Sequence, residues 1–262
     1  MGAPRLPPRR TTVTAIKPPI TAEIGIGEAV TPVGQSFNDG TRQLGEIVAD
    51  SIVNAVAQGV LLPGQRIVES ELASQLKVSR VPIREAIKIL QAQGILHVTP
   101  NRGARVAPFE PRTIDQVFEV RVALERIAVR DASDAYRRDP RQIDTLREII
   151  SRMDRAADWS DWVEFRKCDV DFHHEICRSS GNEIVVKMWE AIARHITIIF
   201  GRELASERNF HLVIEQHRSL IALFEVNDPR IDQVIEEHIM RLRKQNVGAA
   251  KARSPRPRSR NR

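Results

Sequence analysis

The stretch 63–106, PGQRIVESELASQLKVSRVPIREAIKILQAQGILHVTPNRGARV, decides the fold of the first half of the chain. It predicts a short helix over 71–76, a tight turn at KVSR, and a second helix over 81–93 that Gly94 ends. Two β-like runs follow, ILHVT and ARVAP, and the intervening PNRG has the residues of a hairpin turn. This order predicts the core of a winged helix-turn-helix.

The predicted helix 81–93 has two chemically different faces. Its apolar face, at helical spacing, consists of Ile83, Ile87 and Leu90. Its basic face, with a spacing of four, consists of Arg80, Arg84 and Lys88. A recognition helix needs both, an apolar side held by the domain and a cationic side that enters the major groove. In a helix taken alone, such arginines indicate a solvated face more often than a DNA contact, but the helix order and the hairpin favour DNA.

Residues at the ends of these elements could add contacts to DNA. Ser79 precedes the helix, where it can cap the helix or touch a phosphate. Arg102 lies beside Gly103 at the predicted hairpin tip, which suits a minor-groove or phosphate contact.

The same stretch resembles the DNA-binding domain of the GntR-type regulators over nearly all of 43–108, through PG, LA, SR-x-P-x-REA and a glycine-bearing wing. The resemblance implies that Arg80 and Arg84 contact bases or phosphates of an operator, with support from Pro82 and the wing. The candidate DNA-contacting residues are Arg66, Ser79, Arg80, Pro82, Arg84, Lys88, Arg102 and Gly103.

The rest of the chain predicts a mainly α protein with a second, all-α domain. The expected domain boundaries are a disordered leader over 1–42, the winged domain over 43–109, the helical domain over 110–246 and a disordered tail over 247–262. Helices are expected from about residue 44 to Gly59 and then over 111–136, 140–156, 159–178, 182–202, 206–225 and 229–246. Trp159, Trp162 and Trp189 are expected to pack in the core.

The charge and the cysteines of the chain say more about where in the cell the protein is expected than about what it does. The formal charge of +6 resides in the tail 247–262, which has six basic residues and no acidic one, so the overall charge says little about DNA binding. Cys168 and Cys177 fall in one predicted helix at a spacing that cannot close a disulfide. With no apolar run long enough for a signal peptide or a membrane span, a cytoplasmic protein is expected.

Polar residues interrupt the apolar stripes of three predicted helices in the second half. Asp169 and His173 are four residues apart and therefore point the same way, while His217 and His238 lie on two later helices. Burying these groups without partners costs about 1–3 kcal/mol each. One divalent cation would pair with all four, whereas hydrogen-bonded core histidines are the alternative.

The segments DVDFHHEICRSSGN (169–182) and EQHRSLIALFEVNDPRIDQVIEEHI (215–239) resemble the helical effector domain of the FadR branch of GntR regulators, the FCD type. The resemblance extends over 111–246. It implies that Asp169, His173, His217 and His238 hold a metal, for which Zn, Ni, Mn or Fe suits the donors.

Three further residues are candidates for contact with a small carboxylate effector. Arg121 lies on an apolar stripe, where it would face the effector or form an ion pair with an acid such as Glu125. The resemblance favours effector contact. Asn182 could line the same pocket or cap a helix, and His195 could face the cavity.

These features predict a homodimeric transcription regulator, a repressor more simply than an activator, that binds a pseudo-palindromic operator and responds to a small organic acid. One alternative is a DNA-binding protein with a purely structural metal. A metal-dependent enzyme is the other, but no general base is evident beside the four ligands.

Overall fold

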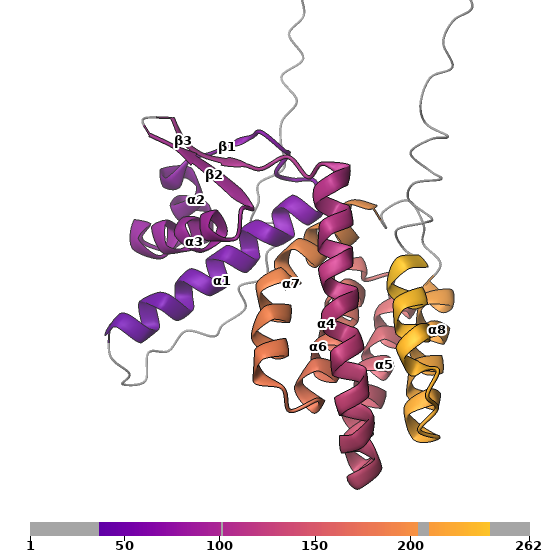
Figure 1. The fold of residues 1–262 in the computed structure, drawn as a ribbon. Helices are drawn as coiled ribbons and strands as arrows, with labels where there is room; N and C mark the ends of the chain where they lie inside the picture. Colours follow the sequence, from indigo (N-terminus) through magenta and orange to yellow (C-terminus); the bar gives the residue numbers. More distant parts are fainter. Residues whose placement is uncertain (1–36, 101, 204–209, 242–262) are drawn as a thin grey trace, which may run out of the picture.

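The computed structural model describes residues 37–100, 102–203 and 210–241 of the 262-residue chain, and most of them are helical (Figure 1). The elements in chain order are α1 (Phe37–Ala57), β1 (Arg66–Ile67), α2 (Glu69–Leu76), α3 (Arg80–Ala92), β2 (Leu96–Thr99), β3 (Gly103–Val106), α4 (Pro111–Arg138), η2 (Pro140–Gln142), α5 (Ile143–Asp158), α6 (Trp162–Ser179), α7 (Glu183–Glu203), α8 (Phe210–Glu225) and a helical segment over 231–241. The predicted fold class, a winged helix-turn-helix followed by an all-α bundle, is confirmed.

The first helix is longer than its apolar stripe predicts. α1 begins at Phe37 and not near Leu44, so the predicted leader was wrong for residues 37–42. Gly40 and Arg42 are exposed, which explains why no apolar period marks these first turns. The remainder of the leader and the tail 247–262 lie outside the described residues.

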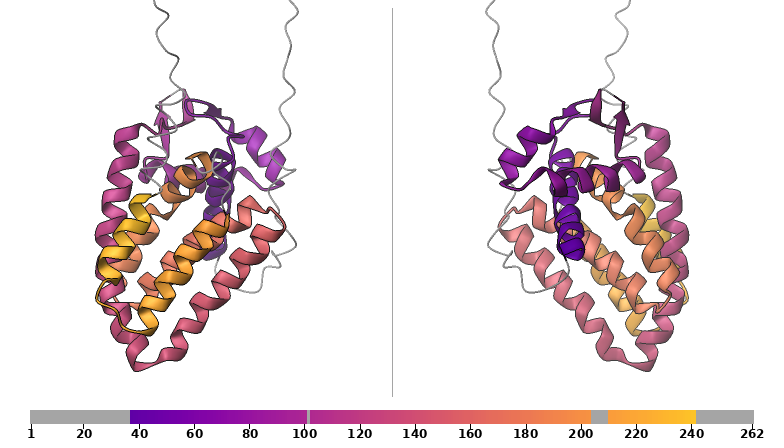
Figure 2. Two further views of the ribbon diagram at one scale, coloured as in Figure 1. Left: turned by 90° about the vertical axis from the view of Figure 1, so that its right-hand side faces the viewer. Right: turned by 90° about the vertical axis from the view of Figure 1, so that its left-hand side faces the viewer.

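Three short antiparallel strands form the wing. The strand order is β1-β3-β2, and the register pairs Leu96 with Val106 and Thr99 with Gly103. The sequence predicted the β2–β3 hairpin but missed the two-residue β1. Gly103 has a φ of +75°, a left-handed conformation that favours glycine after the turn. In Figure 2 the sheet lies at one end of the molecule.

The winged domain and the bundle share a packed junction between α1 and α7. Ile198 of α7 is fully buried in the hydrophobic core of the N-terminal domain. At Gly201 a Cβ atom would lie 2.6 Å from the Cβ of Ala57, so any other residue would force the two helices apart. The Arg194 guanidinium of α7 bonds to Glu46 at 2.6 Å and to Asp50 at 2.8 Å, both on α1.

The bundle packs α4 to α8 and the segment 231–241 around one hydrophobic core. Asp161 caps α6 by accepting bonds from the backbone N–H groups of Val163 and Glu164, so α6 begins after the predicted residue 159. Trp159 therefore falls in the turn before this cap and is 85% exposed, which makes the prediction of a packing role wrong. Among the described helices, none is long and apolar enough to cross a membrane.

Candidate metal centre and nucleic-acid interface

The structure brings together the four residues that the sequence singled out as metal ligands. Asp169 and His173 extend from α6, His217 from α8, and His238 from the segment 231–241. All four are buried, and one ligand atom of each lies within 4.8 Å of the others. This spacing is short enough for a single cation to contact all four groups.

The hydrogen bonds of His217 fix which ring nitrogen is available. Its Nδ1 lies 2.7 Å from the carbonyl oxygen of Val213, one turn earlier in α8, so Nδ1–H donates to that carbonyl. Nε2 is therefore the ring nitrogen left to face the cluster. It lies 3.2 Å from Oδ1 of Asp169, without hydrogen-bond geometry. A cation bound between these two atoms would pair with both of them.

His173 is oriented by a carboxylate. Its Nδ1 lies 2.5 Å from Oε2 of Glu125 on α4, so Nδ1–H donates to Glu125 and Nε2 faces the cluster. Nε2 lies 3.2 Å from Nε2 of His238. A carboxylate behind a histidine is the usual support of a metal-ligating imidazole, because it fixes the tautomer and raises the basicity of the ligand.

The protonation states favour a cation. Burial lowers the pKa of His238 well below its ordinary value, so this ring is neutral. Burial raises the pKa of Asp169, but His217, His173 and Arg121 outweigh it and bring the pKa to about 2. Neutral imidazoles and an ionised carboxylate are the forms that bind divalent metals.

Several buried polar atoms of the described residues have no hydrogen-bond partner, and most of them belong to this cluster. They include both carboxylate oxygens of Asp169, Nε2 of His217, Nδ1 of His238 and Nη1 of Arg121. Each such atom costs about 1–3 kcal/mol if it stays unpaired. The donor set therefore fits a divalent cation better than a set of satisfied core histidines.

Glu125 is the central acceptor behind the cluster, a role that the sequence did not predict. Besides His173 it accepts a bond from Nε of Arg121 at 2.7 Å and from Nε1 of Trp189 at 3.0 Å. Burial alone would raise the pKa of the Glu125 carboxyl. Arg121 and His173 outweigh this effect, so the pKa of Glu125 lies below the ordinary range. The only sequence signal was the four-residue spacing from Arg121, which had suggested an ion pair alone.

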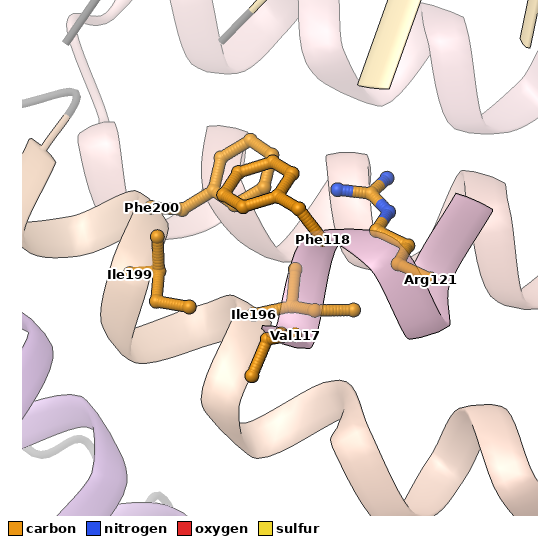
Figure 3. A pocket seen from close by; sticks show the side chains of 6 residues that line it. All are labelled: Val117, Phe118, Arg121, Ile196, Ile199 and Phe200. Atoms are coloured by element: carbon orange, nitrogen blue, oxygen red, sulfur yellow. The ribbon is translucent and has the colours of Figure 1, made fainter. Parts of the chain in front are cut away.

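Arg121 forms an ion pair with Glu125 through Nε, while its Nη1 has no hydrogen-bond partner among the described residues. It is 1% exposed, and its guanidinium carbon lies 5.4 Å from the centre of the Phe200 ring. Figure 3 shows Arg121 at the edge of an apolar pocket whose lining comes from α4 and α7: Val117, Phe118, Arg121, Ile196, Ile199 and Phe200. The pocket is too narrow to admit a water-sized molecule. A ligand can reach Arg121 here only if the pocket opens.

The other two effector candidates have different surroundings. Oδ1 of Asn182 accepts a bond from the backbone N–H of Val185, so the residue caps the start of α7. His195 contacts Phe109 edge-to-face and bonds with the backbone of Gln93, which places it at the junction with the winged domain. Their described contacts therefore point to capping and to the domain junction.

The predicted basic face of α3 is exposed. Arg80, Arg84 and Lys88 are all exposed, while the predicted inner residues Ile83, Ile87 and Leu90 are buried. Arg84 bonds to Glu69 of α2 at 2.9 Å, and Lys88 bonds to Glu85 at 2.8 Å. Because both ion pairs are exposed to solvent and therefore weak, the side chains of Arg84 and Lys88 can exchange them for a contact with a phosphate or a base.

The other predicted DNA-contacting residues near α3 and the wing differ in whether they are exposed or buried. Ser79 is exposed at the start of α3 and makes no capping bond through its side chain, so its hydroxyl is available. Pro82 is buried, so its predicted contact with DNA is corrected to packing in the first helical turn. Arg66, Arg102 and the unpredicted Arg105 are exposed on the wing, and Arg66 pairs in register with Arg105. Strand alternation between Ala104 and Val106 was the signal that could have revealed Arg105.

Comparisons with known proteins agree for both halves of the chain. Residues 44–106 match the bacterial regulatory proteins of the gntR family, and residues 116–241 match the FCD domain. The Nta operon transcriptional regulator of Aminobacter aminovorans is 36% identical over 62% of this chain and 74% of its own length. A probable D-xylose utilization operon transcriptional repressor of Paenarthrobacter nicotinovorans is 28% identical over 73% of this chain and 84% of its own. A solved structure from Rhodococcus sp. RHA1, described as a GntR transcriptional regulator, shares the fold with a TM-score of 0.67 and 20% identity, covering 80% of this chain and 99% of that one.

Proposed function

The chain belongs to the GntR family of bacterial DNA-binding transcription regulators and carries an FCD domain, and on this premise we propose that a small organic acid controls its DNA affinity through the buried Asp/His cluster. The observation that carries the proposal is the buried Asp169 carboxylate, whose two oxygens have no hydrogen-bond partner among the described residues and one of which lies 3.2 Å from Nε2 of His217. Buried polar atoms are normally paired, and a bound cation would pair with these.

The proposed metal site uses Asp169, His173, His217 and His238, with Zn, Ni, Mn or Fe as candidate ions. When bound, the ion offers open coordination positions to a carboxylate. Arg121 supplies the second contact, because its Nη1 is buried and has no partner among the described residues. Glu125 holds both Arg121 and His173 in place.

Helix α7 connects this site with the DNA-binding domain. The pocket beside Arg121 is closed, and half of its lining comes from Ile196, Ile199 and Phe200 of α7. The pocket must open for an acid to enter, and we propose that it opens by a shift of α7. The same helix buries Ile198 in the N-terminal core and holds α1 through Arg194, so a shift changes the position of the winged domain.

We further propose that the protein acts as a homodimer on a pseudo-palindromic operator, since two-fold protein symmetry matches two-fold DNA symmetry. Repression released by the acid is the simpler mode. The similarity to the D-xylose utilization repressor supports this choice.

A DNA-binding titration tests the proposal. An operator is first selected from random-sequence DNA, and its dissociation constant is measured by fluorescence anisotropy with metal-loaded protein. At least one acid from a panel of sugar acids, hydroxy acids, dicarboxylates and aromatic acids is expected to change the constant about 10-fold, within the usual range of coupling. If no acid changes it while the metal is bound, the metal is structural and the proposal is wrong.

The Arg194→Ala variant tests the connection through α7. It removes the ion pairs to Glu46 and Asp50, so the acid is expected to change DNA affinity several-fold less than in the wild type. Metal binding should stay at the wild-type level. The matched control is Arg218→Ala, because Arg218 pairs with Asp154 and Glu215 wholly within the bundle. An undiminished response in Arg194→Ala would show that α7 does not transmit the signal through this contact.

A further inference from the structure

A second cavity lies between the DNA-binding domain and the bundle, away from the metal cluster. Its volume is about 270 Å³, and its walls come from α1, α6 and α7. It shares no lining residue with the Asp/His cluster or with the pocket beside Arg121. Its polar walls include Asp50, Asn54, Arg166, Lys167, Arg194 and Thr197.

Arg166 is the unusual residue of this cavity. It is 6% exposed, and burial lowers the pKa of its guanidinium. The other two largely buried arginines have carboxylate partners, Glu125 for Arg121 and Glu46 with Asp50 for Arg194. Within the described part of the chain, no carboxylate forms an ion pair with Arg166. A buried guanidinium without an anion is costly, so the site favours one.

The surroundings hold the Arg166 guanidinium in place. Its Nη2 donates to Oδ1 of Asn54 at 3.2 Å. Its Nη1 occupies the space beside Gly201, where a Cβ atom would lie 2.6 Å away. Because Oδ1 of Asn54 already accepts this bond, the amide N–H groups of Asn54 remain to donate to a ligand.

The cavity lining carries cations that can pair with an anion. The Arg194 guanidinium is already shared between the carboxylates of Asp50 and Glu46. Lys167 is exposed at the cavity and forms no ion pair with a described residue. Arg166 and Lys167 are therefore the two cations of the lining that have no ion-pair partner among the described residues.

We propose that this cavity binds a small tetrahedral oxyanion, phosphate or sulfate, with Arg166, Asn54 and Lys167 as its donors. The volume lies close to the lower limit of the roughly 300–1,000 Å³ of pockets for drug-sized ligands, which leaves room for phosphate, sulfate or a small phosphate ester. Because the donors come from α1 and α6, the bound anion stabilises this arrangement of the two domains. It is a second input to the regulator, separate from the acid at the metal cluster.

Thermal unfolding of the full chain in EDTA tests the proposal, because metal removal prevents anion binding at the Asp/His cluster. Phosphate is titrated at constant ionic strength, adjusted with sodium chloride. The unfolding temperature of the wild type is expected to rise with phosphate or sulfate concentration and then to level off. The concentration of acetate needed for the same rise should be at least 10-fold higher. Equal binding of acetate, or no saturable rise with phosphate, would overturn the assignment.

Two variants separate the site from general salt effects. Asn54→Asp gives Arg166 a carboxylate from within the chain, so its midpoint without phosphate should be higher and its saturable response should be lost. Arg166→Met should lose the response as well, while Lys187→Met, an exposed lysine elsewhere on α7, should keep it. A wild-type response in Asn54→Asp would show that phosphate binds elsewhere. Tighter binding of glycerol phosphate than of phosphate would identify an ester as the natural source, and weaker binding would identify the free ion.

Discussion

Replacement of His217 by alanine is expected to change the metal content from one divalent ion per chain to none. Nε2 of this imidazole lies 3.2 Å from Oδ1 of Asp169, and the Nδ1–H bond to the carbonyl of Val213 holds the ring in that orientation. Loss of a group that merely supports a ligand lowers metal affinity about 10- to 100-fold, so loss of a ligand itself should cost more. Native mass spectrometry of protein incubated with Zn, Ni and Mn measures the stoichiometry directly.

His211→Ala is the matched control for this experiment, because His211 lies on the same helix and is exposed. It should bind metal as the wild type does. Addition of EDTA should lower the unfolding midpoint of the wild type and of His211→Ala but not of His217→Ala. A ligand present at about 1,000 times its dissociation constant stabilises a protein by about 4 kcal/mol, a shift that thermal unfolding resolves easily. Metal bound at full stoichiometry in His217→Ala would place the ion elsewhere.

The four ligands could be predicted because their placement follows from helix geometry. Asp169 and His173 are four residues apart, which puts them on one face of any continuous helix. Glu125 escaped prediction as a hydrogen-bond centre because its partners His173 and Trp189 come from α6 and α7. Only the tertiary packing of α4 against these helices creates those contacts.

Elements that lack an apolar period were placed less well. The first turns of α1 expose Gly40 and Arg42, so no burial pattern marked the helix before residue 44. β1 is only two residues long, too short to show alternation. Trp159 was expected in the core because it is large and apolar, but the Asp161 cap starts α6 later and leaves Trp159 in an exposed turn.

Alanine at Arg80 or at Arg84 is expected to weaken binding to the selected operator about 10- to 100-fold each, as the loss of a bidentate base contact does. Both side chains extend from the exposed face of α3, whose opposite face is fixed by buried residues such as Ile83. Fluorescence anisotropy on the operator and on scrambled DNA separates two kinds of contact. Loss of a base contact lowers operator affinity alone, while loss of a phosphate contact weakens both and lowers the salt slope by about one.

The control variant is Arg155→Ala, an exposed arginine of α5 in the bundle, which should bind both DNAs as the wild type does. If Arg80→Ala and Arg84→Ala bind the operator within about twofold of the affinity of this control, then another surface of the protein recognises the DNA sequence.

The ion pair between Arg84 and Glu69 allows a sharper test of the same helix. If Arg84 serves only to fasten α3 to α2, then Glu69→Gln should weaken DNA binding as much as Arg84→Ala, because either change breaks the pair. If Arg84 contacts DNA, Glu69→Gln frees the guanidinium and removes a negative charge near the phosphates. Operator affinity should then be unchanged or up to several-fold higher, with a steeper salt dependence. Weaker operator binding by Arg84→Ala but not by Glu69→Gln would therefore show that Arg84 contacts DNA. Equal weakening by both variants would show that Arg84 only holds α3 against α2.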